Sequence, residues 1–343
     1  MPFISSLRGT FGAQSKRNKF PPYITGVSGS VQGGSSFNLA TQSITWSSAG
    51  EYSFTLPLPA SFRASVFGAG GGGAQQGGWS YGYPGGSGGY STAILDLPAG
   101  TYKIIVGEGG GGNSFRTVIG GGHSAQPKTG VTDNRYSAGA GGFSGIFTGT
   151  GTIHDSTGGS GNNTYRTSAV QSRSILIAGG GGGGGSRSGG NDNCAGGHGG
   201  GSTGTGGFSV GSVDNLSRGT QTATGEVRPN EWGQVYNATL MHGGSGGDQG
   251  YGGAGGGGYF AGSNSWSGGG GVMGGGGGGS GFIHPSLASN GITTAGSAQT
   301  SPGGVGQTGY ITGSGYGGNS STNTNNSWQG GTGGSGIVHL SPL

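Results

Sequence analysis

Residues 174–185 read SILIAGGGGGGG, five residues that are small or apolar followed by seven consecutive glycines. The first five are typical of a buried β-strand, because β-branched and apolar side chains dominate them. The glycine run follows at once, with no turn residue between. A flexible linker would mix serine evenly into the glycine and would separate two folded units. The junction therefore predicts a strand that continues into an ordered glycine segment.

The same two kinds of segment recur along the whole chain. No window has the periodicity of an amphipathic helix, so the sequence predicts an all-β protein with interleaved glycine segments. Further strand-type blocks lie at 44–46, 52–56, 62–67, 93–95, 102–106 and 336–340. Further glycine runs lie at 70–73, 109–112, 255–258, 268–271 and 274–279.

Composition excludes several classes of protein. The chain has 97 glycines and 12 prolines in 343 residues, a composition typical of disordered chains. Glycine does not recur at every third position, which excludes collagen. No apolar run is long enough for a transmembrane helix, and the first 20 residues lack the apolar centre of a secretory signal. Cys194 is the only cysteine, so neither an internal disulfide nor a cysteine-based zinc site is expected.

The glycine runs allow two interpretations. Ordering a residue costs about 1–2 kcal/mol of backbone entropy, and glycine loses more than other residues. Left-handed extended helices with three residues per turn could offset this cost, because their peptide groups point outward and neighbouring helices without Cβ atoms could bond to one another. Such a bundle would have a hydrogen-bonded core. The alternative is a set of flexible glycine linkers.

The order of blocks from residue 44 to residue 343 resembles a known family. The stretch at 64–72 (ASVFGAGGG) follows the strand-type block at 51–57, and the block at 97–109 (LPAGTYKIIVGEG) comes next. This succession is similar to the glycine-rich extracellular domain of the anaplastic lymphoma kinase and leukocyte tyrosine kinase receptors. The resemblance implies a jelly-roll, tumour-necrosis-factor-like β-sandwich with inserted polyglycine II helices and essentially no α-helix.

The receptor role does not follow from this resemblance, because signal peptide, membrane span, kinase and cysteine pair are all missing from the sequence. The glycine-rich receptor-binding adhesins of bacteriophage long tail fibres are a second similar group, and they pack polyglycine helices and display variable loops. Residues 7–14 (LRGTFGAQ) also look like short N-terminal segments of structural proteins of marine phages. The resemblance implies a virion protein made in the host cytoplasm.

The net charge of +4 belongs to the N-terminus, because four cations precede Glu51, the first carboxylate. The electroneutral remainder argues against nucleic acid as a partner. We divide the chain into an N-terminal peptide, 1–24, and a glycine-rich domain, 25–343. The peptide is either a frayed terminus or an anchor to another virion protein, with apolar and electrostatic contacts. Its candidate anchoring residues are Phe3, Arg8, Phe11, Lys16, Arg17, Lys19 and Phe20.

Aromatic residues beside glycine, serine and asparagine form the candidate receptor-binding loops. This composition is typical of adaptable binding surfaces, and aromatic faces also suit sugar rings. The alternative is that each ring covers the end of a glycine bundle. The tract 201–241 has few glycine runs and could hold the most variable loop. The candidates are Trp79, Tyr81, Tyr83, Tyr165, Trp232, Tyr236, Tyr259, Phe260, Trp266, Tyr316 and Trp328.

Catalytic and cofactor signals are weak. The six histidines show no metal-ligand spacing, and the carboxylates lie too far apart in sequence to suggest a glycan-cleaving pair. We therefore expect no enzyme activity, no cofactor, no metal site and no membrane insertion.

The sequence predicts a phage fibre or adhesin that binds a host-surface polysaccharide or outer-membrane protein, either as a monomer or as a homo-oligomer. The alternative is an architectural protein without a receptor, either a capsid decoration, a head fibre or a filament subunit.

Overall fold

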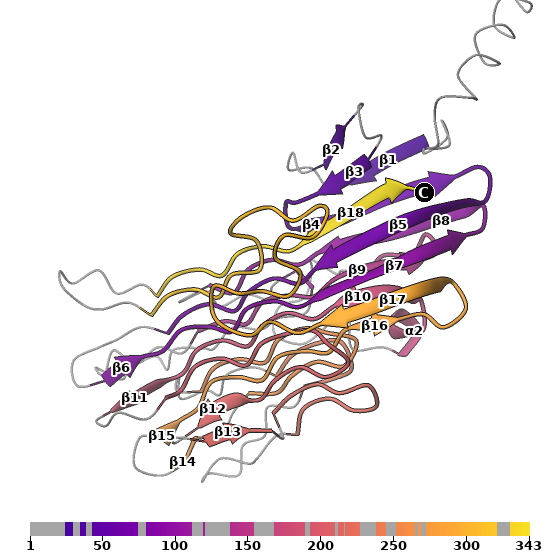
Figure 1. Cartoon of the computed structure of the whole chain (residues 1–343). Helices are drawn as coiled ribbons and strands as arrows, with labels where there is room; N and C mark the ends of the chain where they lie inside the picture. The colour runs from indigo at the N-terminus through magenta and orange to yellow at the C-terminus, as the bar shows by residue number, and fades with distance from the viewer. Residues whose placement is uncertain are drawn as a thin grey trace, which may run out of the picture.

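A computed structural model describes most of the chain, and nearly all its regular elements are β-strands (Figure 1). The one helix among the described residues is α2 (Ser168–Gln171), and no described helix is long and apolar enough to cross a membrane. The described residues are 25–29, 35–38, 43–74, 80–111, 119–120, 138–153, 168–188, 193–209, 212–215, 217–226, 238–244, 252–264, 267–268, 272–320 and 330–343.

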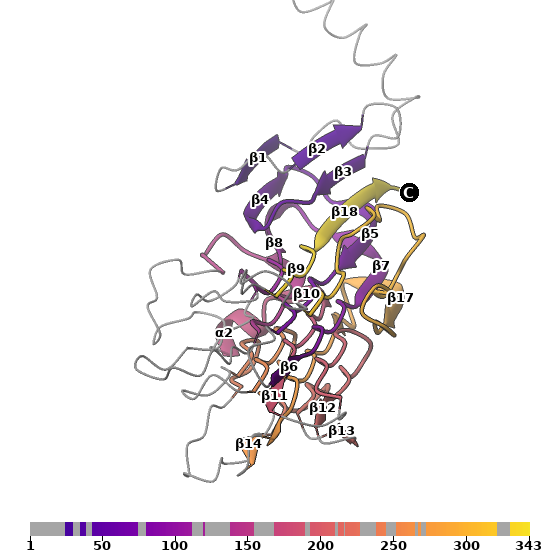
Figure 2. The same ribbon diagram turned by 90° about the vertical axis from the view of Figure 1, so that its left-hand side faces the viewer.

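Two six-stranded antiparallel sheets face each other, and Figure 2 shows them as separate layers. In spatial order, the first sheet contains β1 (Thr25–Gly29), β4 (Gly50–Leu56), β8 (Gly100–Val106), β9 (Ser144–Thr148), β10 (Ser174–Ala178) and β16 (Phe282–Ile283). The second contains β2 (Ser35–Asn38), β3 (Ser43–Trp46), β18 (Ile337–Pro342), β5 (Ala60–Phe67), β7 (Tyr90–Leu97) and β17 (Ala288–Thr294).

The space between the sheets is an apolar core. Strand β4 shows why, because its residues alternate between buried and half-buried along the strand. Phe54 is fully buried, stacks on Tyr102 with ring centroids 5.3 Å apart, and lies 6.0 Å from the ring of Trp46. Alternating side chains of facing strands thus fill one shared core. The predicted all-β sandwich is confirmed.

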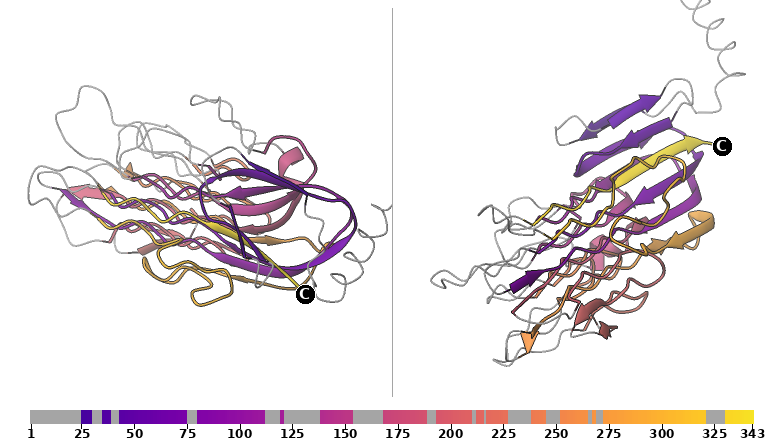
Figure 3. Two further views of the ribbon diagram at one scale, coloured as in Figure 1. Left: turned by 90° about the horizontal axis from the view of Figure 1, so that it is seen from above. Right: turned by 60° about the vertical axis from the view of Figure 1, so that its left-hand side comes forward.

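Strands of both sheets continue directly into glycine segments that run away from the sandwich (Figure 3). The segment 68–74 follows β5, and 179–185 follows β10. In the opposite chain direction, 83–89 leads into β7 and 274–281 leads into β16. The sandwich therefore sets the direction and the spacing of these segments.

The segment 179–185 shows how the glycine segments bind one another. None of its residues has a positive φ, and its peptide N–H groups donate in three directions that repeat every three residues. Gly180 and Gly183 donate to 252–258, Gly181 and Gly184 to 68–74, and Gly182 and Gly185 to 193–199, over N···O distances of 2.8–3.0 Å. Its carbonyls accept from 83–89, 138–142 and 274–280. This three-residue repeat is that of a polyproline II-type helix.

We call the bonded segments glycine helices and the whole assembly the glycine array. The six neighbours of helix 179–185 also bond to one another in a closed ring, which is hexagonal packing. Helices 68–74 and 274–280 each have six bonded neighbours as well. The glycine helices therefore form three parallel rows. The central row contains 330–336, 68–74, 179–185, 274–280 and 217–219. One flanking row contains 315–319, 83–89, 193–200 and 204–208, and the other contains 107–111, 138–142, 252–258 and 260–264.

The close approach of these helices requires glycine. A Cβ atom on Gly182 would fall well inside contact distance of the Gly276 carbonyl oxygen, and one on Gly71 would meet the Gly182 carbonyl oxygen in the same way. Both obstacles are backbone atoms, which cannot rotate aside. These positions therefore require glycine, whereas a small side chain fits at other positions of the array, such as the fully buried Ala69.

We predict that Gly182→Ala destabilises the folded protein by about 3 kcal/mol or more, because it overpacks the array and separates hydrogen-bonded peptide groups. Urea denaturation followed by near-ultraviolet circular dichroism measures the change. Thr332→Ala, at an exposed position of a boundary helix, is the control and should change stability by no more than about 0.5 kcal/mol. Equal stability of the two variants would contradict the packing described above.

Candidate binding surface at the distal end of the glycine array

The end of the glycine array that lies farthest from the sandwich, here called the distal end, carries short antiparallel strand pairs (Figure 1). These pairs are β6 (Ser80–Gly82) with β11 (Ser186–Ser188), β12 (Gly207–Ser209) with β13 (Ser212–Asp214), and β14 (Ser267–Gly268) with β15 (Val272–Met273). Each strand directly adjoins a glycine helix or lies within a few residues of one in the sequence. The array therefore fixes the positions from which the distal segments leave.

Two of the predicted receptor-binding residues lie at the distal end. Tyr81 is in β6, where it pairs with Arg187 of β11. Tyr83 begins helix 83–89, and its side chain is half-buried. Both backbone polar groups of Tyr83, the N–H and the carbonyl, form hydrogen bonds. Its N–H donates to the Gly185 carbonyl over 3.1 Å, and its carbonyl accepts from the Ala74 N–H over 2.8 Å. Residue Trp79 comes immediately before β6 in the sequence.

Most of the other predicted site residues lie outside the described residues. For the receptor-binding loops these are Trp79, Tyr165, Trp232, Tyr236, Trp266 and Trp328. For the anchoring peptide they are Phe3, Arg8, Phe11, Lys16, Arg17, Lys19 and Phe20.

Tyr259 and Phe260 lie together near the sandwich, away from the distal end. The ring of Tyr259 stacks on Phe282 of β16 at 3.9 Å and 11°, and Phe260 meets it edge-on at 5.2 Å and 87°. Gln171 of α2 donates from Nε2 to the Tyr259 carbonyl over 2.6 Å. Burial raises the pKa of the Tyr259 phenol. The array thus does not bring this aromatic group to the same surface as Tyr83.

Tyr316 occupies a third place, on the outer side of helix 315–319. Its neighbour Tyr310 packs against Phe67 and Tyr90, with ring centroids of Tyr310 and Phe67 5.6 Å apart. Burial, together with the adjacent phenol of Tyr316, raises the pKa of Tyr310 to about 12. Tyr310 therefore stays protonated at neutral pH, and Tyr316 lies at the edge of a packed aromatic cluster.

Sequence reasoning missed two apolar residues at the distal end. Phe208 of β12 and Val213 of β13 are directly opposite each other, and Val213 is 42% exposed. The available signal was the alternation of 207–214 (GFSVGSVD) around Val210-Gly211, a pattern typical of a β-hairpin. This pair adds apolar area beside the predicted aromatic segments.

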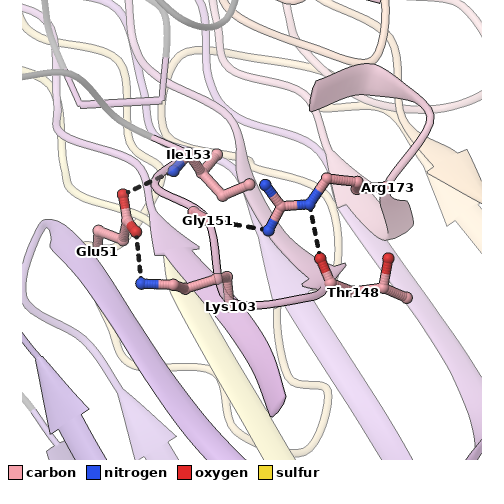
Figure 4. Close-up of polar contacts among 6 residues, drawn as sticks. All are labelled: Glu51, Lys103, Thr148, Gly151, Ile153 and Arg173. Carbon is pink, nitrogen blue, oxygen red and sulfur yellow. Dashed lines mark hydrogen bonds and ion pairs between the residues drawn. The ribbon is translucent and has the colours of Figure 1, made fainter. Parts of the chain in front are cut away.

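One group of charged side chains lies on the sandwich. Glu51 of β4 forms an ion pair with Lys103 of β8 at 2.9 Å and accepts the Ile153 N–H over 3.1 Å (Figure 4). Arg173 donates to the carbonyls of Thr148 and Gly151 over 2.7 and 3.0 Å. Burial lowers the pKa of Arg173, and the Glu51 carboxylate acts in the opposite direction. These contacts fix the loop 149–153, which leads toward Tyr165 in the sequence.

Metal binding finds no support in the described part of the chain, where no three His, Cys, Asp or Glu side chains gather around a common point. Cys194 is buried in helix 193–200. No known protein-family model and no curated protein matches the sequence.

Two histidines, the half-buried His198 and the buried His339, lie in environments that favour the neutral ring. The Ser87 N–H donates to Nδ1 of His198 over 3.1 Å, so this nitrogen carries no proton. Nδ1 of His339 lies 2.8 Å from the Thr45 hydroxyl, and its Nε2 is buried without a hydrogen-bond partner among the described residues. Burial lowers the pKa of both imidazoles below the ordinary 6.5.

We predict that acid destabilises the protein through these histidines. Because both pKa values are lower in the folded state, the unfolded chain binds protons first as the pH falls below 6.5. The stabilisation that the two neutral histidines provide is complete above pH 6.5 and declines between pH 6.5 and their pKa values in the folded state. For each histidine, the free energy of unfolding falls by up to about 1.4 kcal/mol per pH unit. Urea denaturation at pH 7.5 and 5.0 measures it.

The controls compare single variants at the two pH values. His339→Gln and His198→Gln should each reduce the loss of stability between pH 7.5 and 5.0. Thr332→Ala is the control, because it changes no titratable group and should leave the pH dependence unchanged. An unchanged pH dependence in both test variants would contradict this assignment.

Proposed function

We propose that this chain is a non-enzymatic virion fibre or adhesin protein that binds a host-surface receptor through segments at the distal end of the glycine array. The observation that carries the proposal is the hydrogen-bonded array between the sandwich and the distal end. In its interior helices, the peptide N–H and C=O groups form hydrogen bonds with neighbouring helices on all sides. Segments that leave the distal end are therefore displayed from a fixed base.

A fixed base favours binding, because association loses less entropy when the contact groups are already positioned. The array adds few charges of its own, so the side chains at its end determine what binds. Tyr81, Tyr83 and Phe208 lie in the elements at this end, and Trp79 is adjacent to them in the sequence. Aromatic and small polar residues of this kind suit a polysaccharide or an exposed loop of an outer-membrane protein.

The position of β1 supports attachment at the other end of the molecule. Thr25 pairs with Thr55 of β4 in the sandwich, and β1 lies far from β6 and β11 in Figure 1. Residues 1–24, with their four cations and three phenylalanines, would leave the molecule from there. The virion setting itself rests on the resemblance to glycine-rich phage adhesins. An architectural role without a receptor is the competing function.

An adsorption experiment separates the two functions. We expect the purified chain to adsorb to susceptible cells and to block infection by particles that carry it, because it occupies the same receptor. A double variant, Trp79→Ala with Tyr83→Ala, should lose most of this competition. Tyr259→Ala is the matched control, because Tyr259 packs on Phe282 away from the distal end. If the wild-type chain neither adsorbs nor competes, the architectural role is favoured.

Deletion of residues 2–22 tests attachment. We expect the shortened chain to fold, because β1 and all later strands are retained, and to be lost from purified particles, because the anchor is missing. Quantitative immunoblotting of particles measures incorporation, and circular dichroism of the purified chain checks the fold. Unchanged incorporation of the deletion variant would rule out the anchoring role.

A further inference from the structure

Helix 330–336 stands at one end of the central row of the glycine array. Its bonded neighbours are 68–74, 107–110 and 315–319, which all lie on one side of it. Gly331 and Gly334 donate to the carbonyls of Asn319 and Tyr316, whereas Gly333 and Gly336 donate to those of Gly110 and Gly107. The helix therefore has an inner side bonded within the array and an outer side.

The residues of this helix fall into three sets that repeat every three positions, and the set formed by Thr332 and Ser335 points outward. Because the helix has three residues per turn, the N–H groups of Thr332 and Ser335 lie about 120° from the other two donor directions. Neither N–H has a hydrogen-bond partner among the described residues. Thr332 is exposed and Ser335 is half-buried. An identical helix could in principle extend the row here, by the same bonds that hold the interior together.

The side chains of this helix follow the same division. A Cβ on Gly330 or Gly333 would collide with the carbonyls of Gly73 or Gly70 in helix 68–74, so these positions must be glycine. Only the outward set carries side chains. At interior positions such as Gly182 and Gly276, a Cβ would likewise collide with the backbone of a neighbouring helix. The Cβ atoms of Thr332 and Ser335 thus lie on the outer side of the helix, beside the direction of their own N–H groups. The same offset is seen at Gly333, which donates to Gly110 while a Cβ on it would meet Gly70.

We propose that Thr332 and Ser335 close the glycine array against lateral addition of a glycine helix from a second copy of this chain. Each side chain holds a neighbouring backbone away and lets water solvate the outward peptide groups. The role resembles that of the charged or bulged edges by which β-sheets avoid further pairing. Without these side chains, residues 330–336 would present seven glycines.

The flanking row is closed in a different way, which supports this interpretation. The outward residues of helices 83–89 and 193–200 include Ser87 and His198, and the segment 296–303 covers them. Gly296 donates to the Gly199 carbonyl and Gly303 to that of Gly88, both over 3.0 Å. On that face a chain segment bonds to the helices, whereas no described residue accepts a hydrogen bond from the outward N–H groups of Thr332 and Ser335.

The test compares two double variants of the full chain. Thr332→Gly with Ser335→Gly removes both outward Cβ atoms, and Thr332→Ala with Ser335→Ala retains them while removing both hydroxyls. Light scattering after size-exclusion chromatography measures mass over a hundredfold range of protein concentration. We expect the glycine variant to show a concentration-dependent mass at least twice that of the wild type, and the alanine variant to keep the wild-type mass.

Several outcomes would overturn the proposal. Wild-type mass for the folded glycine variant would show that the side chains do not limit addition, and association of the alanine variant would assign the effect to the hydroxyls. Near-ultraviolet circular dichroism of the buried Trp46 reports whether the sandwich is intact. If the double variant unfolds, Thr332→Gly alone provides the same comparison against Thr332→Ala.

Discussion

The peptide hydrogen bond between neighbouring glycine helices is the interaction on which this architecture depends. It forms only where two backbones approach without a Cβ between them, and in the interior it must form in every direction at once. One such bond contributes about 1 kcal/mol net, whereas fixing a residue's backbone costs about 1–2 kcal/mol. A glycine array is therefore not stable through its hydrogen bonds alone. A buried peptide group without a partner would cost a further 1–3 kcal/mol, so a gap in the array is not tolerated either.

The sandwich resolves this difficulty, because it orders the first residue of many glycine helices before they meet. Strands β5, β8 and β10 end where helices 68–74, 107–111 and 179–185 begin, and their core side chains, such as Phe62, Ile104 and Leu176, are fully buried. Apolar burial of this kind contributes about 1.5–3 kcal/mol per large side chain. The free energy of the apolar core thus supports an adjoining structure that has almost no apolar side chains of its own.

How much could be predicted from the sequence follows from the same physics. The strands were visible because their side chains alternate, and the runs 179–185 and 274–279 were visible because close helix packing requires glycine along their whole length. The boundary helices were harder to recognise, because one residue in three faces outward and carries a side chain, as Thr332 and Ser335 do within GGTGGSG. The site was the least predictable part. Tyr83, Tyr259 and Tyr316 have similar sequence surroundings, but they lie in three places, since only the order of helices in the array determines where each segment ends.

These constraints differ between the interior of the array and its distal end, and they determine where the sequence can vary. Interior glycines such as Gly71 and Gly182 tolerate no substitution, because a Cβ there meets the backbone of a neighbouring helix. At the distal end the array fixes the points between which the chain must pass, such as Ala74 and β6. Sequence variation can therefore concentrate between these points without loss of stability in the array. The close packing that requires glycine in the interior therefore does not fix the composition of the distal surface.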